Sequence, residues 1–250
     1  MEKRTYFISD LHLGAKYIPS PIDHQRHVVA WLDEIKHKAK ALYLMGDVLD
    51  YWYEYRYVVP RGFSRFFGKI AELTDSGVEV YWFIGNHDIW IFDYLPQELG
   101  VKVVDGNMVK EIDGKRFFLG HGDGVGKRKK SFRFIRSLFR NRAAQKLFSA
   151  IHPRWTVPFA HSWSSHSRRS HTDIENIEKV IERGKQSLLD FAKEYNAASH
   201  VDYFVFGHIH CLERIEVAPD SSLIILGDWI NLFSYAEFDG KTMRLDCYSK

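Results

Sequence analysis

The sequence contains five short polar motifs whose side chains are of the kinds that bind divalent metal ions. In chain order they are Asp10-x-His12, Gly46-Asp47, Gly85-Asn86-His87-Asp88, Gly120-His121 and Gly207-His208-x-His210. Residues i and i+2 of an extended segment point the same way, so both side chains of the first and last motifs can face one ion. Carboxylate, amide and imidazole ligands together suit borderline-to-hard ions such as Mn²⁺, Fe²⁺ or Zn²⁺, and not soft ions that prefer thiolates. Two such ions about 3.5–4 Å apart clamp an in-line displacement at phosphorus.

Each motif directly follows an apolar run of strand length. The five runs are Thr5–Ile8, Ala41–Met45, Val78–Ile84, Arg116–Leu119 and Tyr203–Phe206. Apolar residues at helical spacing predict helices over His24–Ala39 and Phe63–Ser76, between the first three runs. This alternation indicates parallel βαβ units. Because ligands of such sheets gather beyond the carboxyl ends of the strands, we expect all five motifs to meet at one edge.

The rest of the chain completes one domain. Met108–Ile112 and Arg116–Leu119 flank an Asp113-Gly114 turn and are predicted to form a hairpin, and Asp173–Tyr195 is predicted to be a long helix. Four further strands are predicted at Ile215–Val217, Leu223–Leu226, Ser234–Phe238 and Thr242–Tyr248. We therefore expect a single domain over residues 1–250, interrupted by an insertion at about residues 125–171.

Composition indicates a soluble globular protein with no disulfide framework. Hydrophobic residues make up 45% of the chain and charged residues 27%. The two cysteines, Cys211 and Cys247, form no CxxC pattern, which fits a reducing cytoplasm. The sequence shows neither a secretory signal pattern nor an apolar run of the ~18–20 residues that span a bilayer. A cytoplasmic location is expected.

The net charge of +3 conceals a strongly basic insertion. Residues 124–172 contain twelve Lys or Arg and no Asp or Glu, which leaves 23 basic and 32 acidic residues elsewhere. A stretch of one sign favours an anionic partner, although a solvated basic face is the alternative. Three sets of residues recur at helical spacing there: Phe132, Ile135 and Phe139; Arg133, Arg136 and Arg140; Leu147, Phe148 and Ile151. Basic amphipathic helices lie on anionic membranes or cover lipid-like ligands; the alternative is a lid whose apolar face is core.

Taken singly, each motif is as easily a surface turn as a ligand set, but together and in this order they resemble the calcineurin-like metallophosphoesterases. The resemblance implies an α/β fold with four layers, α/β/β/α, plus the helical lid. It implies that one ion is held by Asp10, His12, Asp47 and His210. It implies that the other is held by Asp47, Asn86, His121 and His208. Asp47 would then bridge two divalent ions, for which Mn²⁺ is favoured over Fe²⁺ or Zn²⁺.

The same resemblance implies roles for the two remaining residues of the third motif. His87 would face the scissile phosphate, and could donate a proton to the leaving oxygen or stabilise charge in the transition state. Asp88 would orient His87, as carboxylates beside a metal site often do. The alternative for Asp88 is to cap a helix beginning at Ile89.

Longer stretches are similar to the UDP-2,3-diacylglucosamine hydrolases, a family of pyrophosphatases in lipid A biosynthesis. These stretches are Phe7–Gly14, Ala41–Trp52 and Asp75–Val78, followed by the helical insertion after Gly120-His121-Gly122-Asp123. The similarity implies cleavage of UDP-2,3-diacylglucosamine to UMP and 2,3-diacylglucosamine 1-phosphate. The implied substrate-binding residues are Asn86, His87, Arg168, Arg169 and His208. An acylated nucleotide sugar as substrate, and a peripheral position on the inner membrane through the basic lid, follow from the same similarity.

Two positions depart from that family. Its members read Gly-Asn-Arg-Asp where this chain has His87, and an arginine can clamp phosphate through two hydrogen bonds. In the insertion, Ser164–Arg169 only loosely matches the segment that holds substrate. A phosphodiesterase or phosphatase for another lipid or nucleotide, or a nuclease, is therefore an alternative. Nucleic acid is disfavoured because apolar residues are interleaved with the basic ones, and no protein partner is predicted.

Overall fold

The protein is described by a computed structural model over residues 3–126, 130–159, 162 and 174–249. It contains two β-sheets that pack face to face. The first has the strand order β11-β10-β1-β2-β3-β4 and the second the order β5-β6-β7-β9-β8. The first sheet comprises β1 (Arg4–Ile8), β2 (Ala39–Leu44), β3 (Glu79–Phe83), β4 (Lys102–Val104), β10 (Ser234–Phe238) and β11 (Met243–Cys247). The second comprises β5 (Met108–Ile112), β6 (Lys115–Leu119), β7 (Tyr203–Phe206), β8 (Leu212–Ala218) and β9 (Ser221–Leu226).

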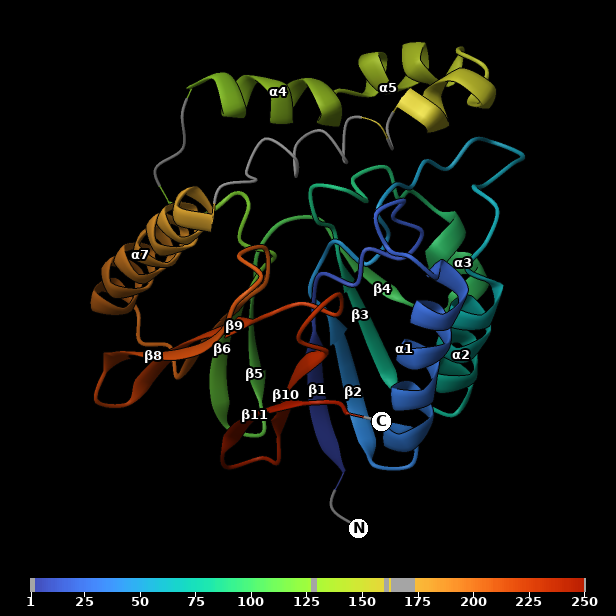
Figure 1. Cartoon of the computed structure of the whole chain (residues 1–250). Coiled ribbons are helices and arrows are strands. Elements are labelled where there is room, and N and C mark those ends of the chain that lie inside the picture. The colour runs from blue at the N-terminus through green and yellow to red at the C-terminus, as the bar shows by residue number, and fades with distance from the viewer. Residues whose placement is uncertain (1–2, 127–129, 160–161, 163–173, 250) are drawn as a thin grey trace.

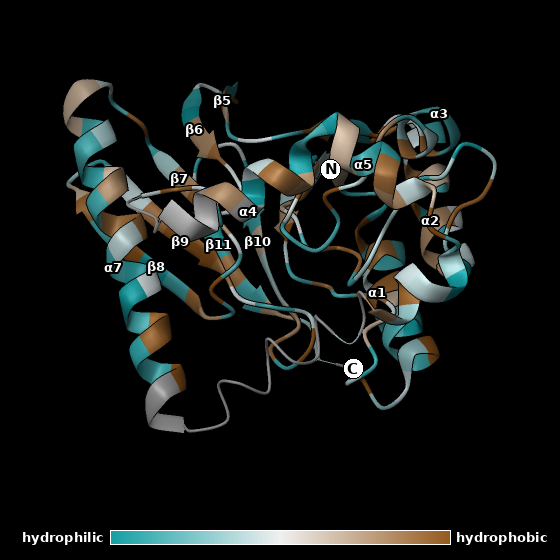
Figure 2. Ribbon diagram, turned by 90° about the horizontal axis from the view of Figure 1, so that it is seen from above, coloured by the Kyte–Doolittle hydropathy of each residue, from teal (hydrophilic) through white to brown (hydrophobic). Residues whose placement is uncertain are grey.

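Helices cover the outer face of each sheet. The first sheet is covered by α1 (Pro21–Ile35), α2 (Ser64–Asp75) and α3 (Tyr94–Leu99), and the second by α7 (Ile174–Ala198). Figure 1 shows these layers side by side, with α4 (Lys130–Arg140) and α5 (Arg142–Ser149) lying across their upper edge. The predicted four-layer α/β/β/α architecture is confirmed. Seen from above in Figure 2, α4 and α5 lie between α7 on one side and α1–α3 on the other.

The central strands are buried on both faces, which explains why their sequences are continuous apolar runs. In β1, Tyr6 and Ile8 face the helices of the first layer, whereas Phe7 faces the second sheet. Between the sheets, the Phe7 ring lies 4.9 Å from that of Tyr43 and 5.8 Å from that of Phe117. This alternation follows from the two-residue period of a strand.

Most predicted elements occur within a few residues of their expected bounds, and the exceptions have local causes. α1 begins at Pro21 rather than His24, since proline is favoured in the first turn of a helix. It ends at Ile35 rather than Ala39, because Ala39 already pairs with Arg4 in the sheet. No helix begins at Ile89: the next one, α3, starts at Tyr94. Among the described residues, no helix has the length and apolarity needed to cross a bilayer.

Candidate dinuclear metal centre

The five motifs meet at one end of the two sheets, each in the segment that follows a strand. Asp10, His12 and His210 have ligand atoms within 4.8 Å of one another, and so do Asp47, His121 and His208. The first group joins the segments after β1 and β7, whereas the second joins those after β2, β6 and β7. The seventh expected ligand, Asn86, places its Oδ1 atom 3.3 Å from Nε2 of His121.

Asp47 lies between the two groups. Its Oδ2 atom is 3.3 Å from Nε2 of His121 and 3.8 Å from Nε2 of His12. In the first group, Oδ1 of Asp10 is 3.4 Å from Nε2 of His210 and 3.7 Å from Nε2 of His12. A carboxylate in this central position can bind one ion of each group.

Five of the seven residues adopt a left-handed backbone conformation that non-glycine residues rarely adopt. These are Asp10 (φ 56°), His12 (φ 44°), Asp47 (φ 51°), His208 (φ 68°) and His210 (φ 55°). Such conformations cost of order 1–3 kcal/mol each and persist where surrounding contacts enforce them. Here the enforcing contacts include hydrogen bonds from Asp10 N to Gly46 O (3.1 Å) and from His12 N to Asp47 O (2.9 Å). The sharp bends turn side chains of both segments toward the same point.

The glycines of the motifs are required because the segments approach one another closely. A Cβ atom on Gly207 would overlap Ser9 Oγ and lie 2.6 Å from Asp10 Oδ2. A Cβ atom on Gly85 would overlap the backbone nitrogen and carboxylate of Asp47. Only glycine leaves room for these carboxylates beside the neighbouring backbone.

Four imidazoles direct Nε2 into the centre and Nδ1 toward an acceptor of the protein. Nδ1 of His121 lies 2.9 Å from Met45 O, and Nδ1 of His210 lies 3.2 Å from Asp228 Oδ2. Nδ1 of His12 lies 3.3 Å from Asp50 Oδ1. Nδ1 of the fourth imidazole, His87, lies 3.1 Å from Asp50 O. An acceptor at Nδ1 fixes the tautomer and turns the Nε2 lone pair toward the centre.

Neither Asp50 nor Asp228 was identified from the sequence. Asp50 stands three residues after Asp47, and Asp228 follows β9 just as the ligands follow their strands. That position after a buried strand was the signal that could have found Asp228.

The structure corrects the expected role of Asp88. Its Oδ1 accepts a hydrogen bond from Gly85 N (2.8 Å), and its Oδ2 accepts from Val48 N (3.1 Å) and Trp82 Nε1 (3.2 Å). These contacts brace the turn before His87, and no hydrogen bond joins Asp88 to the imidazole of His87 among the described residues. Asp50 occupies the position beside His87 instead. Asp88 caps no helix either, since residues 89–93 are not helical.

The site buries ionised carboxylates beside imidazoles. Burial opposes ionisation of Asp10 and Asp47, but neighbouring imidazoles outweigh it and lower the pKa of both carboxyls. Burial also lowers the pKa of His208 to about 4, with the nearby His121 adding to the effect. Oδ1 of Asp10 is buried and accepts no hydrogen bond from the described residues. Ionised carboxylates, a neutral imidazole and an orphaned oxygen fit divalent metal ions.

The sequence of residues 3–212 matches the family described as calcineurin-like phosphoesterase. The chain belongs to this family. It is a metallophosphoesterase, hence a hydrolase.

Several relatives share the whole length of this phosphoesterase. It is 44% identical to a UDP-2,3-diacylglucosamine hydrolase of Porphyromonas gingivalis over 98% of both chains. It is 26% identical to a protein of the same name from Neisseria meningitidis serogroup B, over 92% of this chain and 91% of that one. A third, from Ralstonia nicotianae, is 27% identical over 96% of this chain and 88% of that one.

The insertion of this phosphoesterase is fixed to the segments that carry the third motif and Asp47. Trp90 Nε1 donates to Phe139 O (2.9 Å), and Tyr53 OH donates to Gln145 O (2.7 Å). Phe148 packs against the rings of Tyr53 and Trp90, at 5.3 and 4.7 Å. The apolar stripe predicted in the insertion is therefore divided, with Phe148 inside and Leu147 (74% exposed) outside.

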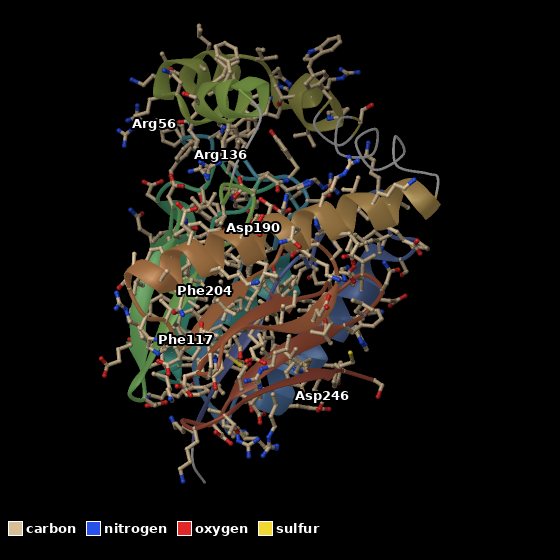
Figure 3. All side chains as sticks on the ribbon, turned by 90° about the vertical axis from the view of Figure 1, so that its left-hand side faces the viewer. Arg56, Phe117, Arg136, Asp190, Phe204 and Asp246 are labelled. Carbon is tan, nitrogen blue, oxygen red and sulfur yellow. The ribbon has the colours of Figure 1, made fainter. Side chains whose placement is uncertain are left out.

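Two predicted lid arginines hold the insertion on the body of the enzyme. Arg136 Nε donates to Asp123 Oδ2 (3.0 Å), two residues after the expected ligand His121, and Arg140 pairs with Asp105. Figure 3 shows Arg136 between the lid and the layers below it. Both guanidinium groups therefore already have carboxylate partners. Arg168 and Arg169 lie outside the described residues.

Proposed function

We propose that this phosphoesterase hydrolyses the pyrophosphate of UDP-2,3-diacylglucosamine, releasing UMP and 2,3-diacylglucosamine 1-phosphate for lipid A assembly. The observation that carries the proposal is the 44% identity to the hydrolase of P. gingivalis over 98% of both chains. The arrangement of the ligands supports it, because a dinuclear centre is suited to attack at phosphorus.

Two divalent ions, for which we propose Mn²⁺, would be held by the seven residues that meet at the centre. Asp10, His12, Asp47 and His210 would hold one, and Asp47, Asn86, His121 and His208 the other. When bound, such ions would polarise phosphoryl oxygens and supply an activated water as the nucleophile. The chain's own contribution is to fix the imidazoles with their Nε2 atoms facing inward.

His87 is proposed to act on the phosphate rather than to bind metal. Its Nε2 atom lies 3.9 Å from Asp47 Oδ2, and its side chain is 20% exposed, whereas that of His121 is 1% exposed. It therefore stands at the open side of the centre, where a phosphoryl group would enter. With Asn86 and His208 it would contact the substrate. The Nε2 atom can donate a proton to the leaving oxygen or a hydrogen bond to a phosphoryl oxygen.

The outer surface of the lid supports a peripheral position on an anionic membrane, which for this pathway is the cytoplasmic face of the inner membrane. Four large apolar side chains recur every four residues there: Leu147 (74% exposed), Ile151 (49%), Trp155 (71%) and Phe159 (62%). Exposed basic side chains are interleaved with them, at Arg142, Lys146 and Arg154. Apolar side chains can enter the interface while the basic ones meet anionic headgroups. Arg168 and Arg169 are proposed to contact the phosphates of the substrate.

The decisive experiment is incubation of the enzyme with UDP-2,3-diacylglucosamine and Mn²⁺ in mixed micelles, with both products identified by mass spectrometry. UMP and the diacylated sugar phosphate in equal amounts are expected. A nucleoside product other than UMP, or no cleavage where bis(p-nitrophenyl) phosphate is hydrolysed well, would overturn the assignment of this substrate. Rapid cleavage of plain oligonucleotides, insensitive to detergent, would favour a nuclease instead.

A further inference from the structure

The loop between β9 and β10 forms hydrogen bonds with two ligands of the first metal group. Among the described residues, no hydrogen bond joins it to a residue expected to bind only the second ion. It begins at Asp228, whose Oδ2 atom lies 3.2 Å from Nδ1 of His210. The backbone nitrogen of Trp229 donates to the carbonyl oxygen of Asp10 (3.2 Å). Asp10 and His210 are both left-handed residues, so external restraint bears directly on their geometry.

The carboxylate of Asp228 is itself held rigidly. Its Oδ1 atom accepts hydrogen bonds from three consecutive backbone nitrogens of the loop: Ile230 N (3.0 Å), Asn231 N (2.7 Å) and Leu232 N (3.1 Å). Only 3% of the residue is exposed. Because the loop holds Oδ1, Oδ2 has a fixed position from which it accepts a hydrogen bond from Nδ1 of His210. The Nε2 atom of His210 is then deprotonated and faces Asp10, as a metal ligand requires.

A histidine of α1 fixes the other side of the loop. The Nε2 atom of His24 lies 2.6 Å from the carbonyl oxygen of Trp229. Because a carbonyl only accepts, the proton of His24 must be on Nε2. The indole of Trp229 is fully buried and lies 5.1 Å from that of Trp31, which stands about two turns after His24 on the same helix. Helix α1 and this loop therefore form one packed unit behind Asp10.

Of the residues expected to bind only the second ion, His121 and Asn86 have different outer contacts, whereas His208 donates its backbone nitrogen to Asp10 Oδ2 (2.8 Å). His121 uses the carbonyl oxygen of Met45 at its Nδ1 atom, and Asp88 braces the Gly85 turn that carries Asn86. No hydrogen bond connects Asp228, Trp229 or His24 to these groups in the described part of the chain.

We infer that Asp228 and His24 are positioning residues for one ion only, that of Asp10, His12 and His210, so that the two halves of the centre can be weakened separately. This inference rests on the two-ion centre proposed above. Loss of such an outer contact lowers metal affinity about 10–100-fold. The predicted consequence is unequal affinity: one ion weakened to that extent, the other bound as in the unchanged protein.

The test measures Mn²⁺ binding to the full chain by titration calorimetry, with metal content determined after equilibrium dialysis. The unchanged protein should bind two ions; fewer would refute the proposed centre, and this inference with it. Asp228→Asn should bind one ion normally and the other about 10–100-fold more weakly. His24→Leu, which alters no metal ligand and no carboxylate, should weaken the same ion and remains informative if Asp228→Asn does not fold.

Two controls assign the effect to one ion. Asp239 receives hydrogen bonds from Lys241 N (2.9 Å) and Thr242 N (2.8 Å) in another loop, so Asp239→Asn tests loss of a loop-bracing carboxylate alone. It should leave both affinities unchanged. In double-variant cycles, Asp228→Asn should be strongly coupled to His210→Ala and additive with His208→Ala. Equal weakening of both ions, normal binding of both, or the reverse pattern of coupling would overturn the inference.

Discussion

The Oδ1 atom of Asp50 lies 3.3 Å from the Nδ1 atom of His12, and both side chains are almost completely buried. The same carboxylate lies 3.5 Å from Nδ1 of His87. One residue thus orients a proposed metal ligand and the imidazole proposed to meet the phosphate. This shared acceptor links metal binding to the position of His87.

Replacement of Asp50 by asparagine should therefore reduce both metal affinity and turnover. An amide keeps the shape of the side chain but lacks the charge that fixes the Nδ1 proton of His12. We expect a fall of about 10–100-fold in kcat/KM, measured on UDP-2,3-diacylglucosamine at saturating Mn²⁺. Asp246→Asn on β11 is the control, since among the described residues its exposed carboxylate accepts hydrogen bonds only from Cys247 N (2.8 Å) and Tyr235 OH (3.4 Å). Unaltered kinetics in Asp50→Asn would exclude the orienting role.

Addition of one methyl group at Gly207 should disrupt the centre. In Gly207→Ala the Cβ atom would overlap Ser9 Oγ and press on Asp10 Oδ2, both fully buried, so we expect a destabilisation of about 1–3 kcal/mol and loss of metal. Gly68→Ala in α2 is the matched control, because its Cβ would have no neighbour within 4 Å. It should stabilise the protein by about 0.5–1 kcal/mol, as alanine does in a helix. Denaturant unfolding measures both changes; equal stability of the two variants would contradict the packing argument.

Features that depend on neighbouring residues in the chain, such as strands and helices, could be predicted from the sequence. The strand before Asp10 is an apolar run and could be located without a structure, and so could the polar residues that follow such runs and cluster in the fold. β4 was missed because Lys102–Val104 is too short to show a period. The lid was predicted to be helical, but which of its faces packs inward depends on Tyr53 and Trp90, far away in the chain.

The outer contacts of the site could not be predicted, because they join distant segments. Asp50 and His12 are 38 positions apart, and Asp228 follows His210 by 18. Asp88 illustrates the opposite error: it is adjacent to His87 in sequence, yet its carboxylate contacts Val48, 40 positions away. Adjacency in the chain is therefore weak evidence of contact between side chains on a tight turn.

The exposed lid stripe should determine membrane binding without contributing to the chemistry. Leu147→Glu combined with Trp155→Glu removes two apolar groups and adds charge that anionic lipid repels. Burial of such side chains is worth about 1.5–3 kcal/mol each, so binding to vesicles with anionic lipid should fall at least tenfold. Cleavage of bis(p-nitrophenyl) phosphate in detergent-free solution should be unaffected. The control is Val109→Glu on β5, also an exposed apolar residue (42%). Equal vesicle binding by the double variant and the control would contradict the proposed surface.

Asp47 should be indispensable to both proposed ions, since its carboxylate lies between the two ligand groups. Asp47→Asn keeps the side-chain volume and an oxygen for the hydrogen bond from His87 N, which is 2.9 Å long. It removes the negative charge with which a carboxylate can bridge two cations. We expect both Mn²⁺ affinities to fall and hydrolysis of UDP-2,3-diacylglucosamine to drop to the background rate, with the circular dichroism of the fold retained.

Asp202→Asn is the matched control: its carboxylate likewise accepts a backbone hydrogen bond, from Arg116 N (2.8 Å), but lies away from the centre. That variant should lose some stability and keep two ions and full activity. If Asp47→Asn still bound two ions and retained a tenth of the activity, a bridging role for Asp47 would be untenable, and the two ions would have to be held independently.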